Sequence, residues 1–118
     1  MVAEGNGMTS LSTHVLDTMH GRPAAGMAVS LHGPDGPIAS GTTDADGRCP
    51  GLFPTGLAAG GYRLDFAVAA YFRAAGVTLP EPPFLDVVTI AFGMAGAGGH
   101  YHVPLLVSPF AYSTYRGS

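Results

Sequence analysis

The sequence predicts an all-β fold, a sandwich of seven to eight strands with one short helix. Eighteen glycines and ten prolines divide the 118 residues into short segments. Runs of β-branched and aromatic residues stand between these breaks, which is typical of strands joined by turns. The length fits one hydrophobic core. We expect residues 1–9 to form a flexible leader and residues 10–118 to form a single domain.

Three strands are expected in the first part of the chain. They are Leu11–Leu16, Met27–His32 and Ile38–Thr43, and segments rich in Gly and Pro separate them. The third strand is followed by Asp-Ala-Asp-Gly at positions 44–47, where the Asp residues and the glycine favour a tight reversal of the chain.

The middle of the chain changes from a strand pattern to a helix pattern. Tyr62–Val68 has the clearest two-residue period, with apolar side chains at every second position. Ala69–Ala75 is rich in alanine and ends at Gly76, which predicts about two helical turns with a glycine stop. A helix this short is not stable alone, so it must pack on the sheet.

Three further strands are expected in the last third. Leu85–Phe92 is apolar on both faces, which favours a place in the middle of a sheet. His100–Val107 and Ala111–Arg116 are separated by a Ser-Pro pair at 108–109, so we expect them to form a hairpin-like pair.

The charge content of the chain argues against several functional classes. Only 11% of the residues are charged, the net charge is −3, and the five basic residues are all arginines without a cluster. This pattern argues against nucleic-acid binding and favours self-association. No apolar run approaches the length of a membrane span. The N-terminus lacks the features of a secretory signal, so we expect a cytoplasmic protein. Cys49 is the only cysteine, which rules out an internal disulfide.

Two histidines near the C-terminus could carry chemistry. His100 and His102 are separated by one residue, so a strand would place both imidazoles on one face about 7 Å apart. Three interpretations are open from the residues alone. The histidines could bind zinc with His14 as a third ligand, bond to the backbone in a structural role, or act in acid–base catalysis.

Three motifs resemble one known family. HYHVPLLVSPFAYSTYRGS at 100–118, LSTHVLDTMHGRPAAGMAVSL at 11–31 and TTDADGRC at 42–49 closely resemble segments of the transthyretin-related proteins that act as 5-hydroxyisourate hydrolases. Three separated motifs in the same order are far more specific than one. The resemblance implies a transthyretin-like (prealbumin-like) Greek-key sandwich. It also implies a homotetramer with active sites at the dimer–dimer interface.

The resemblance also implies an activity and a set of site residues. The activity is hydrolysis of 5-hydroxyisourate to 2-oxo-4-hydroxy-4-carboxy-5-ureidoimidazoline in urate catabolism. His14 and His102 would share water activation and proton delivery, because imidazole supplies a base near neutral pH. Arg48 would bind and polarise the substrate. Tyr115 would contact the substrate and Ser118 would orient the other groups. No cofactor and no metal are expected.

Two alternatives compete with the enzyme. A transthyretin-like carrier would bind a small molecule without catalysis, and a metal-binding sandwich would use His14, His100 and His102. Carriers of the family have lost these histidines and the YRGS ending, whereas this sequence keeps His14, Arg48, His102 and residues 115–118. The sequence therefore favours the enzyme, with His100 in a supporting role at most.

Overall fold

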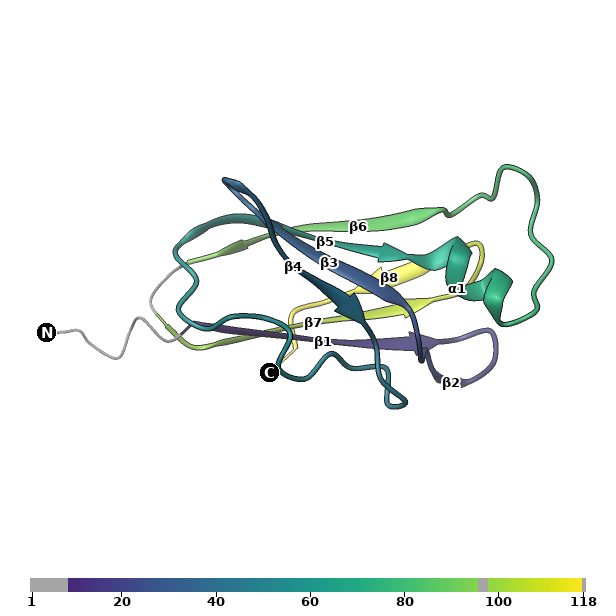
Figure 1. Cartoon of the computed structure of the whole chain (residues 1–118), viewed down its shortest axis with the longest axis horizontal. Coiled ribbons are helices and arrows are strands. Elements are labelled where there is room, and N and C mark those ends of the chain that lie inside the picture. Colours follow the sequence, from purple (N-terminus) through teal and green to yellow (C-terminus); the bar gives the residue numbers. More distant parts are fainter. Residues whose placement is uncertain (1–8, 96–97, 118) are drawn as a thin grey trace, which may run out of the picture.

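The computed structural model describes residues 9–95 and 98–117. These residues form two β-sheets packed face to face, with one helix at an end of the sandwich (Figure 1). The elements in chain order are β1 (Ser10–Asp17), β2 (Arg22–Pro23), β3 (Ala28–Gly33), β4 (Gly36–Thr42), β5 (Gly60–Ala67), α1 (Val68–Ala74), β6 (Val87–Met94), β7 (His100–Val107) and β8 (Tyr112–Thr114). The predicted all-β sandwich with one short helix is confirmed.

Most of the expected leader lies outside the described residues, as does Ser118. Thr9, the last residue of that leader, is buried, and its carbonyl accepts a hydrogen bond from Gly56 N. Among the described helices, none has the length and apolar character needed to cross a membrane.

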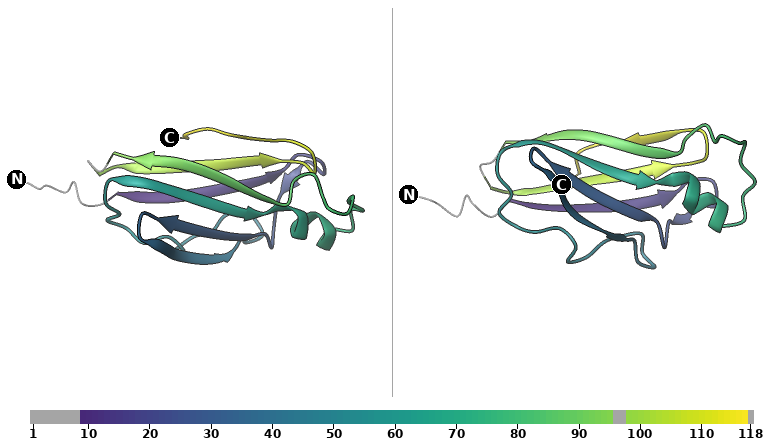
Figure 2. Two further views of the ribbon diagram at one scale, coloured as in Figure 1. Left: turned by 90° about the horizontal axis from the view of Figure 1, so that it is seen from above. Right: turned by 45° about the horizontal axis from the view of Figure 1, so that its top comes forward.

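Each sheet of the described residues has four strands. One pairing of neighbouring strands within a sheet matters for the site. The strand orders are β2-β1-β7-β8 and β4-β3-β5-β6. Strands β1 and β7 run parallel, with Ser10 opposite His100 and Ser12 opposite His102. Figure 2 shows the strands running along the length of the molecule, with α1 at the end opposite the start of β1. The parallel pairing places the N-terminal motif directly beside the C-terminal motif.

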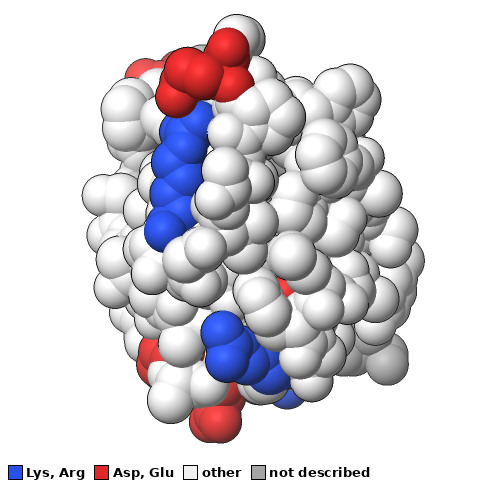
Figure 3. Space-filling model, turned by 90° about the vertical axis from the view of Figure 1, so that its right-hand side faces the viewer, with Lys and Arg blue, Asp and Glu red and all other residues white. Residues whose placement is uncertain are grey.

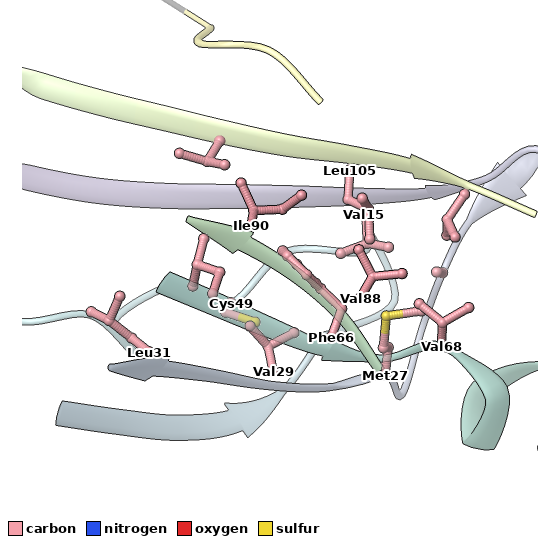
Figure 4. Close-up of a cluster of buried hydrophobic side chains, with 14 of the residues drawn as sticks. Val15, Met27, Val29, Leu31, Cys49, Phe66, Val68, Val88, Ile90 and Leu105 are labelled. Atoms are coloured by element: carbon pink, nitrogen blue, oxygen red, sulfur yellow. The ribbon is translucent and has the colours of Figure 1, made fainter. Parts of the chain in front are cut away.

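The core lies between the two sheets and is built from alternate residues. Val15 and Leu105 from one sheet pack toward Phe66, Val88 and Ile90 from the other (Figure 4). The odd-numbered residues of β1 and β7 are buried, whereas the even-numbered residues of β1 are only half-buried. Successive side chains of a strand point to opposite faces. The even-numbered residues, including the histidines, therefore lie on the outer face of their sheet.

One expectation about strand position is wrong. The segment 85–92 was expected in the middle of a sheet, but β6 lies at an edge and pairs with β5 alone among the described strands. Its burial alternates, and Val87 is 54% exposed. Strand β6 is therefore an edge strand. The described chain buries one of its faces and leaves the other exposed.

Other boundaries differ by a few residues. Helix α1 begins at Val68 and is followed by Gly76 with a φ of 88°, which is the glycine stop that the sequence predicts. The two-residue strand β2 was not predicted, because Gly-Arg-Pro at 21–23 has the composition of a turn. Strand β8 ends at Thr114, two residues before the expected end.

A buried carboxylate fixes α1 to the first sheet. Asp17 is 1% exposed and accepts hydrogen bonds from His20 Nδ1 at 2.6 Å and from Tyr71 Oη at 2.8 Å. Burial raises the pKa of the Asp17 carboxyl, but the hydrogen bonds from His20 and Tyr71 outweigh burial and leave the pKa below its ordinary value. The carboxylate therefore links β1, the turn after it and the helix.

Replacing Asp17 with alanine is expected to lower the free energy of unfolding by about 3 kcal/mol, because the buried Tyr71 hydroxyl loses its acceptor. The folded-state pKa is depressed, so the carboxylate contributes fully above the unfolded pKa of 3.8 and loses its contribution as the pH falls below that value. Urea unfolding at fixed protein concentration, at pH 7 and at pH 3, measures both effects. Asp35→Asn, at an exposed turn, is the control and should change stability by less than about 0.5 kcal/mol.

Candidate active site

The structure brings three of the predicted site residues to one outer face of the β2-β1-β7-β8 sheet. His14 lies on β1 and His102 on the neighbouring strand β7, two positions apart in the parallel register. Arg48 joins them through an isolated antiparallel bridge to His14. Segments that are far apart in the sequence therefore meet at one open surface.

The turn before Arg48 is docked tightly on β1. Val15 N donates to Gly47 O at 2.8 Å, and Asp44 Oδ1 accepts from Arg48 N at 3.0 Å. Gly47 has a φ of 77°, and a Cβ atom there would lie 2.4 Å from Val15 O. Only glycine fits this approach. The turn predicted from Asp-Ala-Asp-Gly therefore holds the backbone of Arg48 against the strand that carries His14.

The same turn determines the tautomer of His14. His14 Nε2 lies 2.8 Å from Asp46 O. A carbonyl oxygen only accepts hydrogen bonds, so Nε2 carries the proton. In the neutral ring the lone pair then resides on Nδ1, which is the atom of His14 that is able to accept a proton.

His102 is held in a half-buried position beside positive charge. Burial lowers the pKa of its imidazole, and Arg48, His100 and His14 lower it further. The ring is therefore neutral at pH 7 and able to act as a base. Its Nδ1 lies 2.7 Å from Ser12 Oγ.

The C-terminal segment closes over the His102 ring. Gly117 N donates to His102 O at 2.7 Å, and a Cβ atom on Gly117 would lie 2.6 Å from His102 Cδ2. A side chain at position 117 would therefore displace the imidazole from its present position. Ser118 follows directly but lies outside the described residues.

The two preceding residues of the motif have different environments. The Arg116 guanidinium stacks over the Tyr101 ring with its Cζ 4.0 Å from the ring centroid. Tyr115 is 60% exposed. A hollow of about 230 Å³ between β6 and this segment is lined by Phe92, Tyr101, Tyr115 and Arg116, among others, and contains neither His14 nor His102.

The arrangement of the three histidines does not favour a metal centre. His100 and His102 lie with their rings nearly parallel and 6.5 Å between centroids, and Ser12 Oγ stands between their nitrogens. His14 bonds instead to the turn at Asp46. In residues 9–95 and 98–117, no group of three or more His, Cys, Asp or Glu side chains is placed to hold an ion.

Comparisons with known proteins agree with the motifs. The model of the HIUase/Transthyretin family matches residues 11–117. The chain belongs to this family. It is similar to the 5-hydroxyisourate hydrolase of Ralstonia nicotianae, with 57% identity over 94% of this chain and 100% of that protein. The transthyretin-like fold is therefore established.

Two solved structures of the same fold belong to proteins with different functions. The 5-hydroxyisourate hydrolase of Klebsiella pneumoniae superposes with a TM-score of 0.79 at 38% identity, over 92% of this chain and 98% of that one. Sea bream transthyretin in complex with thyroxine superposes with a TM-score of 0.81 at 35% identity, over 91% of this chain and 93% of that one. The fold alone does not separate a hydrolase from a binding protein. The curated relatives named as hydrolases, at up to 57% identity, place this chain with the enzymes.

The sequence did not reveal Ser10 and Ser12 on β1, which bond to the histidines of β7. It also did not reveal the close contact of Gly117 with the His102 ring. Only one signal was available for the serines, which is their two-residue alternation with His14. That alternation gains meaning once β1 is known to pair in parallel with β7.

Proposed function

We propose that this protein hydrolyses 5-hydroxyisourate to 2-oxo-4-hydroxy-4-carboxy-5-ureidoimidazoline in urate degradation. The observation that carries the proposal is the meeting of His14, Arg48 and His102 on one face beside Gly117. The names of the relatives support the same reaction. The expected cytoplasmic location stays a prediction from the sequence.

The residues suggest how water would open the ring. A neutral imidazole, His102 or His14, takes a proton from water, and the resulting hydroxide attacks the cyclic amide carbonyl. Negative charge gathers on the carbonyl oxygen of the tetrahedral intermediate, and the permanently charged Arg48 opposes it. The C–N bond then breaks, and the imidazole returns a proton to the departing ring nitrogen. No covalent bond to the protein is needed.

The C-terminal motif would complete the substrate contacts. Tyr115 is sufficiently exposed to contact a bound purine-derived ring. Ser118 follows Gly117, which itself touches His102, so its hydroxyl would orient the imidazole and the guanidinium. Both roles are part of the proposal.

We also infer a homotetramer, with sites completed where dimers meet. In the described chain, β6 and β8 are the free edges on one side of the two sheets. Large apolar side chains beside these edges are exposed, namely Phe84 (70%), Val87 (54%), Phe110 (60%) and Tyr112 (46%). The rings of Phe84 and Phe110 lie 6.2 Å apart. Free edges with exposed aromatic residues favour strand pairing between copies.

Low surface charge supports the same assembly. Figure 3 shows the end of the molecule that carries α1, where uncharged side chains cover most of the surface and arginine and acidic groups are few. His14, Arg48 and His102 also lie on an open face of the single chain, which a neighbouring subunit would enclose. Sedimentation of the active protein is expected to show four subunits, and a fully active monomer would contradict the assembly.

The decay of freshly generated 5-hydroxyisourate, followed by its ultraviolet absorbance with and without a chelator, tests the reaction. We expect the protein to accelerate the decay to the same extent in both conditions. No acceleration would favour the carrier alternative. Acceleration that is lost with the chelator would show a metal-dependent site.

The rate is expected to fall at acidic pH, because protonation of His102 removes the base. The pKa of His102 is lowered from 6.5 by burial and by neighbouring positive charge, so the midpoint of the fall in kcat/KM should lie below 6.5. Initial rates from pH 5 to pH 8.5 at constant ionic strength measure it. A rate that stays level down to pH 5 would contradict the imidazole base.

A further inference from the structure

A continuous row of hydrogen-bonding groups runs from His102 to the protein surface. His102 Nδ1 lies 2.7 Å from Ser12 Oγ, which lies 2.8 Å from His100 Nε2. The other ring nitrogen of His100, Nδ1, lies 2.6 Å from Ser10 Oγ. The row exists because β1 and β7 pair in parallel, so their outward side chains alternate between serine and histidine across the strands.

The chemistry of Ser12 restricts how these bonds are arranged. A serine hydroxyl has one proton to donate, so Ser12 cannot donate to both imidazoles. At least one of the two rings must therefore donate to Ser12, which can accept from one ring and donate to the other, or accept from both. A neutral imidazole has one protonated and one bare nitrogen. When Ser12 donates to one of the rings, the row has two consistent directions, which differ in whether His102 Nε2 is bare or protonated.

We propose that Ser12 and His100 form a proton relay that connects His102 with solvent at Ser10. The proposal rests on the proposed function, in which His102 serves as a base. In the resting direction His102 Nδ1–H donates to Ser12, Ser12 donates to His100 Nε2, and His100 Nδ1–H donates to Ser10. His102 Nε2 is then bare and able to take a proton.

The relay conserves protons at every step. When a proton arrives at His102 Nε2, the Nδ1 proton moves to Ser12, and the hydroxyl proton of Ser12 moves to His100 Nε2. The Nδ1 proton of His100 moves to Ser10, which releases its own hydroxyl proton to water. One proton enters and one leaves, and both rings stay neutral. The reverse sequence restores the bare nitrogen and delivers a proton to the site.

The surroundings of His102 disfavour a positive charge on its ring. A protonated His102 would be partly buried next to the positive charge of Arg48, with His14 and His100 as its other titratable neighbours, and these groups disfavour its cationic form. A relay lets the ring accept a proton without becoming a cation. His100 is exposed and Ser10, at the end of the row, is half-buried, so protons can exchange with water there. Ser12 and His100 would therefore act through His102 as positioning residues.

The tautomer of His102 tests the relay independently of activity. In protein labelled with ¹⁵N-histidine, we expect His102 to be protonated at Nδ1 at pH 7.5, with a bare Nε2. Ser12→Ala should shift the ring toward the Nε2–H form that free imidazole prefers, and Ser12→Thr should restore the Nδ1–H form. Ser30→Ala removes a similar serine–histidine contact, 3.3 Å to His32 on the other sheet, and should leave His102 unchanged. A wild-type His102 protonated at Nε2 would overturn the relay, and so would a wild-type His100 protonated at Nε2, because Ser12 would then donate to neither ring.

Kinetics tests its contribution to turnover. Ser12→Ala and His100→Phe should each lower kcat roughly 10-fold with KM nearly constant, as part of the 10²–10⁴-fold that acid–base catalysis supplies. The double variant should lose no more than either single variant, because both changes break one row. Losses that multiply, or single variants within twofold of wild type, would overturn the relay. A wild type without hydrolase activity would instead refute the proposed function, and the tautomer would still report on the row.

Discussion

Replacing His102 with asparagine is expected to lower kcat/KM for 5-hydroxyisourate roughly 10³-fold, because the site loses its half-buried neutral base. Asparagine is close in size and its amide can still bond to Ser12, but it cannot take a proton near neutral pH. Asparagine is no larger than histidine, so it fits against Gly117 and the C-terminal segment should stay in place. The decay of the substrate absorbance measures the loss directly.

A second histidine provides a matched control for this experiment. His32 lies half-buried on the outer face of the other sheet, where it contacts Ser30 at 3.3 Å and Asp65 at 3.6 Å. His32→Asn removes an imidazole of similar exposure from a strand of similar length, and should leave kcat/KM within twofold of wild type. If His102→Asn kept the wild-type fold and more than a tenth of the activity, the proposed base would be wrong.

The fold was largely predictable because its local signals agree with one another. The two-residue period of Tyr62–Val68 corresponds to β5, whose inward side chains are buried. The alanine-rich run with its glycine stop became α1 within one residue of the prediction. The position of β6 was not predictable in the same way. Apolar residues on both faces indicate that neither face of the strand is strongly polar, but they do not determine whether a second strand pairs with its other edge.

The sequence predicts which residues form the site, but it does not predict how they are connected. His100 and His102 share a face by alternation, and the motifs point to His14 and Arg48. The sequence gives no local signal that β1 and β7 lie parallel, since strands about 90 residues apart are paired by the fold as a whole. Ser12 acquires its contacts to two imidazoles only through that pairing.

The architecture shared by the family explains how the outer face of this sheet can carry the proposed site. A hydrolase and a thyroxine-binding transthyretin share this architecture at TM-scores of 0.79 and 0.81. The buried residues that form the sandwich come from the inward positions of the strands, whereas His14 and His102 occupy outward positions. Outward positions can change without disturbing the core. The same sandwich can therefore support a catalytic or a purely binding surface.

Replacing Arg48 with glutamine is expected to lower kcat roughly 10²–10³-fold, because the developing negative charge on the substrate oxygen loses its counter-charge. Arg48→Lys should recover part of the loss, since an ammonium group restores the charge but not the forked pair of donors. The turn should remain intact, because it is held through the backbone of Arg48 and not through its side chain. Arg63→Gln on the other sheet, which removes an exposed pair with Asp65, is the matched control and should leave kcat within twofold.

The Arg48→Gln variant gives a second readout, which a loss of folding would not produce. Arg48 is one of the groups that lower the pKa of His102. Without its charge that pKa should rise toward 6.5, so the acidic limb of the kcat/KM profile should move to higher pH. Arg48→Lys keeps the positive charge and should keep the limb near its wild-type position. An acidic limb that stays at the same pH in Arg48→Gln would show that the guanidinium does not affect the pKa of His102. A limb that moves to higher pH would show that the charge of Arg48 lowers this pKa.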